Sequence, residues 1–157
     1  MFKKQTIADI FLDERTVIRR SAQVEHERKV AIYDILEDNM FEPGGGFTGP
    51  YNLHIRIEEN RLTFDIRDHR DKPLTEITLP LSSFRSIVKD YFLICDNYYK
   101  AIKTSAPSQI EAIDMGRRAM HNEGANLLTQ RLDGKVKLDS VTARRLFTLI
   151  CVLHIRA

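Results

Sequence analysis

Three runs between residues 53 and 79 alternate apolar with polar side chains, which is the period of a β-strand with one buried face. The apolar positions are Leu53, Ile55, Ile57, Leu62, Phe64, Ile66, Ile77 and Leu79. Asn60 in the first gap tolerates the left-handed backbone of a tight turn, and residues 68–73 form a longer polar turn in the second gap. We therefore predict a three-stranded antiparallel meander, which a short strand over residues 6–12 extends to four strands.

Most of the remaining chain has the period of an α-helix. Helices are expected over about residues 21–40, from 82 to at least 102, over 107–131 and from 140 to about 153. Ser21 is suited to cap the first helix, either Asp139 or Ser140 the fourth, and Pro107 suits a first helical turn. Residues 42–50, rich in glycine and proline, are predicted to form a loop. Segregated strands and helices predict an α+β fold, with one N-terminal and three C-terminal helices packed mainly on one face of the meander.

Length and composition place the chain among ordinary globular proteins. Its 157 residues are 43% hydrophobic and 29% charged, which predicts one globular domain over residues 1–157. The two cysteines, Cys95 and Cys151, each lie in an apolar run and are expected to be reduced core thiols. No secretory signal pattern or membrane-length apolar stretch is present, so we expect a cytoplasmic protein that does not enter a membrane.

Several short motifs resemble known functional signatures but lack the required context. Residues 44–49 match G-x-G-x-x-G, yet they follow a helix and precede a strand, the reverse of a dinucleotide-binding unit. Residues 69–71 spell the start of a kinase catalytic loop without its asparagine. His26-Glu27 lacks the second histidine of a zinc-protease helix, and no Cys-x-x-Cys occurs. We therefore expect no metal and no cofactor.

One polar ridge on the third helix deserves comparison with catalytic sites. Asp114, Arg117 and His121 fall within about 60° of each other on a helical wheel, with Arg118 beside them. In a functional interpretation, Arg117 and Arg118 bind a phosphate or carboxylate, while His121, tuned by Asp114, transfers a proton. In a structural interpretation, which we favour, Asp114 pairs with the arginines and His121 bonds a neighbouring helix.

Three pairs of adjacent arginines could form an anion site if the fold brought two of them together. They are Arg19-Arg20, Arg117-Arg118 and Arg144-Arg145. The formal net charge of +2 gives no strong overall field, and no RNA-binding signature is present. We therefore do not expect nucleic acid as a partner, although RNA binding stays one alternative.

Long segments of the chain resemble Uncharacterised Protein Family 0262, a family of alphaproteobacterial proteins of unknown function. The resemblance is carried by residues 60–66, 84–95, 107–118, 121–124 and 144–154. It is weakest at residues 44–49 and 68–73. The resemblance implies a bacterial cytoplasmic protein and transfers no catalytic residue.

The absence of a catalytic signature favours a non-catalytic interaction or regulatory protein. It would bind a protein partner, or a second copy of itself, through the open sheet face or the glycine loop at residues 44–49. The alternative is a small enzyme acting on an anionic substrate. In that case His121 and Asp114 would be the catalytic candidates, with Arg117 and Arg118 binding the ligand.

Overall fold

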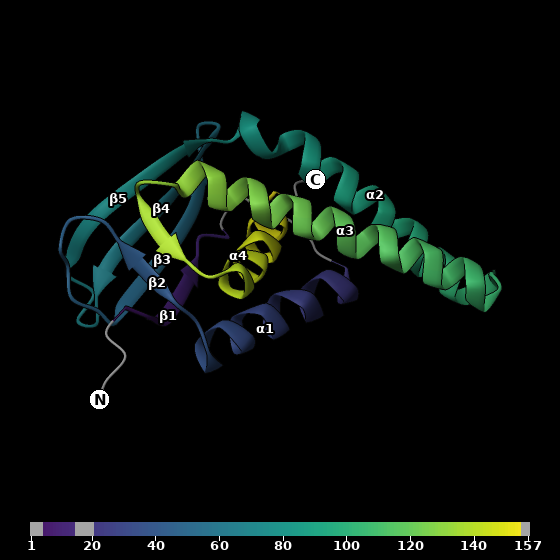
Figure 1. Cartoon of the computed structure of the whole chain (residues 1–157), viewed down its shortest axis with the longest axis horizontal. Helices are drawn as coiled ribbons and strands as arrows, with labels where there is room; N and C mark the ends of the chain where they lie inside the picture. The colour runs from purple at the N-terminus through teal and green to yellow at the C-terminus, as the bar shows by residue number, and fades with distance from the viewer. Residues whose placement is uncertain (1–4, 15–20, 155–157) are drawn as a thin grey trace.

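The computed structural model describes residues 5–14 and 21–154. In chain order the elements are β1 (Ile7–Leu12), α1 (Ala22–Glu37), β2 (Phe41–Pro43), β3 (Tyr51–Glu58), β4 (Arg61–Asp68), β5 (Pro73–Pro80), α2 (Ser82–Thr104), α3 (Pro107–Leu132), β6 (Val136–Leu138) and α4 (Ser140–Leu153). Figure 1 shows the main sheet at one end of the molecule and the helices gathered beside it. This arrangement confirms the predicted α+β class.

The predicted meander forms from strands β3, β4 and β5. Leu53 pairs with Ile66 and Ile55 with Phe64, so the apolar residues of neighbouring strands lie on the same face. That face is buried, and its side chains join one continuous core with those of α4. Cross-strand packing of this kind fixes the register, because a slip of one residue would expose every apolar side chain.

Strand β1 joins the sheet beside β3, giving the order β1-β3-β4-β5, but it runs parallel to β3 and not antiparallel to it. The reason is that α1 lies between them in the chain and returns it to the same end of the sheet. Asn39 stabilises this crossover by linking α1 to β1. Its Oδ1 accepts from the Ile7 amide at 2.7 Å, and its Nδ2 donates to the carbonyl oxygens of Ile7 and Ile35. The four-stranded sheet is therefore mixed.

The segment after α1 forms more regular structure than its composition suggests. Phe41–Pro43 is the short strand β2, which pairs antiparallel with β6 before the glycines begin. Pro43 is tolerated because it ends a strand only three residues long. The prediction of a continuous loop over residues 42–50 is therefore wrong at its first two positions.

Helix α4 lies between α1 and α3 and contacts both of them (Figure 1). Most of its side chains are buried, as its apolar sequence predicts, and Asp139 caps its N-terminus by accepting from the Thr142 amide. Helix α3 runs unbroken past Gly116 and passes α4 closely at Gly124, where any β-carbon would collide with the Phe147 ring. Within the described residues, no helix combines the length and the apolar character that crossing a membrane requires.

Candidate functional site

A pocket of about 540 Å³ opens between α1, α3 and α4, a size typical of small-molecule sites. We call it the inter-helix pocket. Its lining residues are His26, Glu27, Val30, Ala31, Asp34, Tyr91, Arg117, Arg118, His121, Asn122, Arg144, Arg145 and Thr148. Two of the three arginine pairs noted in the sequence therefore meet at one cavity. The third pair, Arg19-Arg20, lies outside the described residues.

The wall formed by α3 carries two arginines held by one carboxylate. Oδ1 of Asp114 accepts from Nη2 of Arg117 at 2.6 Å and from Nε at 3.1 Å. Oδ2 of Asp114 lies 3.2 Å from Nη2 of Arg118, whose side chain is 63% exposed. These are the i,i+3 and i,i+4 pairs of the structural interpretation. One carboxylate shared by two guanidinium groups leaves this wall with a net positive charge.

Arg117 is the more firmly held of the two. Its guanidinium carbon lies 4.8 Å from the centroid of the Tyr98 ring, a cation–π distance. Burial opposes its positive charge, but the hydrogen bonds to Asp114, the charge of Asp114 and the interactions with Tyr91 together outweigh that effect and raise the pKa of Arg117. Arg117 is therefore positioned as a fixed charge at the edge of the pocket.

The imidazole of His121 is half-buried and neutral at pH 7. Its Nε2 lies 2.7 Å from the hydroxyl oxygen of Thr148 on α4, and its ring centroid lies 5.3 Å from that of Tyr91. Burial lowers the pKa of His121 to about 4, and the positive charges of Arg117 and Arg144 act in the same direction. A group that holds no proton at pH 7 is a poor general acid, and a pKa of about 4 also makes it a weak general base, so this environment does not favour proton transfer by His121.

The structure also separates Asp114 from His121, which the functional interpretation had coupled. No hydrogen bond or ion pair joins the two side chains in the described part of the chain. Asp114 pairs with the two arginines of α3, and His121 forms its hydrogen bond with Thr148 on α4. The physical reason is that a carboxylate beside two guanidinium groups is drawn to them and away from a neutral ring. The charges that act on His121 are therefore arginines and not an acid.

The two arginines of α4 have different roles. Nη1 of Arg145 donates to the backbone carbonyl oxygens of Asp34 and Asp38, both at 3.0 Å. It thereby supplies the positive charge that the last turn of α1 lacks. Arg144 has no carboxylate within ion-pair distance among the described residues, although it lines the pocket. Arg144 is therefore the cation that the fold leaves available to a ligand.

The wall formed by α1 has the opposite charge. Glu27 and Asp34 line the pocket from this side, with Val30 and Ala31 between them. Glu27 Oε1 accepts a hydrogen bond from the Tyr99 hydroxyl at 3.0 Å. The pocket is thus basic on α3 and α4, whereas its α1 wall is acidic with apolar residues between the two acids, so a bound molecule would be oriented by charge.

Neither cysteine is an activated nucleophile. Cys95 and Cys151 are free and buried, as predicted, and burial raises the pKa of the Cys95 thiol to about 11. Burial raises the pKa of Cys151 as well. A thiol with a raised pKa stays protonated and unreactive at neutral pH. The described residues also contain no group of three side chains suited to hold a metal ion.

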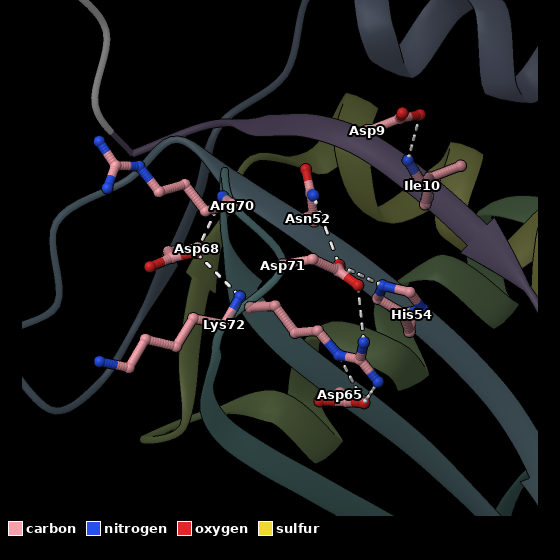
Figure 2. Close-up of polar contacts among 10 residues, drawn as sticks. Asp9, Ile10, Asn52, His54, Asp65, Asp68, Arg70, Asp71 and Lys72 are labelled. Carbon is pink, nitrogen blue, oxygen red and sulfur yellow. Dashed lines mark hydrogen bonds and ion pairs between the residues drawn. The ribbon is translucent and has the colours of Figure 1, made fainter.

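The second concentration of charge lies on the outer face of the sheet (Figure 2). The Asp71 carboxylate accepts from Nη1 of Arg67 at 2.8 Å and lies 2.7 Å from Nε2 of His54. Nε and Nη2 of Arg67 donate to Oδ2 of Asp65, a buried residue on the inner strand β4. The hydrogen bond with His54 is the main cause that lowers the pKa of Asp71. On this outer face of the sheet, the acidic side chains are therefore paired with basic side chains of the same face.

Sequence reasoning identified the α3 part of the pocket but missed Thr148, Asn122 and the α1 wall. A signal for Thr148 was present: in a helix that is mostly apolar, Arg144, Arg145 and Thr148 follow the i, i+1, i+4 spacing of a single polar strip. No comparable signal marks Glu27 or Asp34, because charged residues are spread around much of α1.

Comparison with known proteins identifies the family of the chain. The model of an uncharacterised protein family, UPF0262, matches residues 4–156. A UPF0262 protein of Paramagnetospirillum magneticum is 61% identical over 153 residues, covering 98% of both chains. One from Rhodospirillum rubrum is also 61% identical, covering 96% of this chain and 92% of the relative. One from Agrobacterium fabrum is 54% identical, covering 96% and 95%. No solved structure matches.

Proposed function

The chain belongs to the uncharacterised protein family UPF0262, and we propose that it is a non-catalytic regulatory protein that binds a small organic anion in the inter-helix pocket. The observation that carries this proposal is Arg144, which lines the pocket without a carboxylate partner among the described residues. Arg118 lies on the facing helix and shares its only described carboxylate with Arg117. An anionic group between Arg144 and Arg118 would supply the missing negative charge.

The remaining pocket residues indicate the shape of the ligand. Glu27 and Asp34 repel an anion, so the charged group points toward α3 and α4. Val30, Ala31 and the Tyr91 ring offer apolar contacts to the body of the molecule. A carboxylate or phosphate attached to a small apolar or aromatic group fits this lining best.

Binding without reaction is favoured over catalysis by the state of His121. Its ring is neutral at pH 7 and its Nε2 is engaged with Thr148, so His121 is poorly suited to act as an acid or a base on a bound anion. A small ligand is favoured over RNA because Arg117 and Arg144 lie in a hollow between helices and not along an exposed stripe. The two buried free thiols support placement in the reducing cytoplasm.

The test uses thermal unfolding of the full chain with benzoate and inorganic phosphate as probes. Benzoate is expected to raise the melting temperature of the wild type, because a ligand at about 100 times its Kd stabilises by about 2.7 kcal/mol. Arg144→Gln should abolish the shift, and Arg118→Gln should reduce it. Arg131→Gln is the matched control, since Arg131 is an exposed arginine at the far end of α3 that does not line the pocket.

Equal shifts in the wild type and in Arg144→Gln would contradict the proposal, as would the absence of any shift with either probe. A shift with benzoate but not with phosphate would identify the apolar body as a required part of the ligand. A shift with both would show that the anionic group is sufficient.

A further inference from the structure

One face of α1 carries large exposed apolar side chains, of which Val30 also lines the inter-helix pocket. Val30 is 42% exposed, Tyr33 is 65% exposed and Leu36 is 41% exposed, whereas Ala31 and Ile35 point into the core. Figure 1 shows α1 at the outer edge of the molecule, with α4 on its inner side. An exposed apolar stripe on a surface helix is typical of an interaction site.

Two charges flank this stripe. Lys29 lies four residues before Tyr33 and Glu37 lies four residues after it, and both are exposed. Neither forms an ion pair within the described part of the chain, although Arg28 on the same helix pairs with Glu14 and Glu25. We define the α1 face as Lys29, Val30, Tyr33, Leu36 and Glu37.

The α1 face is symmetric about Tyr33. Apolar residues lie at three positions before and after it, and opposite charges lie at four positions before and after it. A two-fold axis that lies across the two helices at their contact point, and not along them, makes the helices antiparallel. It therefore brings the positive end of one face to the negative end of the other, so the face is complementary to itself.

We propose that the α1 face is the interface of a homodimer, in which α1 of one copy crosses α1 of a second copy at Tyr33. When the i±4 rows of two helices lie side by side, the helices cross at about −50°, the commonest class of helix packing. The row Lys29–Tyr33–Glu37 is such a row. Lys29 then faces Glu37 of the second copy, and the Val30 and Leu36 side chains each meet their own counterparts.

A second copy explains the pattern better than a different partner does. An unrelated protein would require an apolar stripe, but it would not require opposite charges at equal spacing about one residue. The contact involves one helix of sixteen residues, so the buried area is at the low end for specific interfaces. The dimer is therefore expected to dissociate on dilution.

The test is sedimentation equilibrium of the full chain over a range of concentrations. The wild type should show a concentration-dependent monomer–dimer equilibrium. Lys29→Glu and Glu37→Lys should each raise the dimer Kd at least about tenfold, because each places like charges opposite one another. An equimolar mixture of the two variants should dimerise again, since a mixed pair restores both ion pairs. Lys89→Glu, an exposed change on α2, is the matched control and should dimerise as the wild type does.

The proposal is overturned if the wild type is monomeric at every concentration, or if either variant alone dimerises with the wild-type Kd. It is also overturned if the mixture stays as weak as the separate variants. Both positions are exposed, so folding is expected to be intact, and unchanged far-ultraviolet circular dichroism checks this. Neither residue lines the inter-helix pocket, so benzoate binding should persist in both variants.

Discussion

The outer face of the sheet and the inter-helix pocket both gather arginines, but their charges are balanced differently. On the sheet, Arg67 lies between Asp65 and Asp71 and donates to both. In the pocket, Asp114 alone serves two arginines, and Arg144 has no carboxylate partner among the described residues. Side chains of the same type therefore stabilise the fold in one region and remain available to a ligand in the other.

This difference follows from how each region is built. Alternate residues of a strand point to the same face, which places Arg67 beside Asp65 two residues earlier on β4, and the turn after β4 brings Asp71 within reach of the same guanidinium group. The charged partners on the sheet are therefore close neighbours in the chain. The pocket collects residues from separate helices that are far apart in the chain, and its charges are set by which helix faces meet. An unbalanced charge in such a hollow is costly unless something binds it, which makes it a better indicator of function than the paired network.

The largest expected effect concerns the acid stability of the pocket. The pKa of His121 is about 4 in the folded state, below its ordinary value of 6.5. Between these two pH values the unfolded chain binds more protons, so stability falls as the pH drops through this window. The loss approaches about 3 kcal/mol near pH 4. Urea unfolding at a series of pH values measures it.

His121→Gln should flatten this pH dependence, because glutamine does not titrate. His69→Gln, in the exposed turn between β4 and β5, is the matched control and should keep the wild-type slope. Equal slopes for the wild type and His121→Gln between pH 6.5 and 4 would show that the pocket does not hold this ring in its neutral form.

The next effect tests the packing of α3 on α4, which sets the position of the pocket's arginines. A β-carbon on Gly124 would lie 2.2 Å from the Phe147 ring, whereas one on Gly116 would meet only the end of the Ile94 side chain at 2.9 Å. Gly124→Ala should therefore destabilise by about 2 kcal/mol. Gly116→Ala should stay within about 1 kcal/mol of the wild type, since alanine also favours the helix.

Urea unfolding at pH 7 compares the two glycine variants on the same helix. If both cost the same, the close approach of α3 to α4 at Gly124 is not a rigid feature of the fold. In that case the pocket walls are free to adjust, and the contrast with the sheet is weaker than we infer.

The smallest effect distinguishes the two regions directly. Arg67→Gln should destabilise by about 1.5 kcal/mol, because it leaves the buried Asp65 without its cation. Arg144→Gln should change stability by less than about 0.5 kcal/mol at pH 7, because it breaks no ion pair among the described residues. It should also raise the pKa of His121, which NMR titration of the imidazole measures. A larger loss in Arg144→Gln than in Arg67→Gln would reverse the comparison.

Much of the architecture could be predicted from local patterns. The alternation at Leu53, Ile55 and Ile57 predicted strand and face together, and Pro107 marked the first turn of α3. The direction of β1 could not be predicted in this way, because it depends on the path of α1 and on the Asn39 hydrogen bonds. A six-residue strand has the same pattern of apolar and polar residues whether it pairs parallel or antiparallel with its neighbour, so the pattern does not give its direction.

The α3 part of the candidate site was also visible in the sequence. Helical spacing placed Asp114, Arg117 and His121 on one ridge, and the i,i+3 and i,i+4 pairs formed as that spacing requires. The partner of His121 was not visible, because Thr148 belongs to another helix, twenty-seven residues further along the chain.

By itself, the sequence determined the helices, the meander, the buried thiols and the polar ridge of α3, since each of these follows from spacing within a few turns or strands. Only the tertiary structure decided that Arg117-Arg118 and Arg144-Arg145 share one cavity, and that α1 closes it with acidic residues. The physical reason is that periodicity tells which face of a helix is apolar, whereas the packing of three helices decides which polar edges meet.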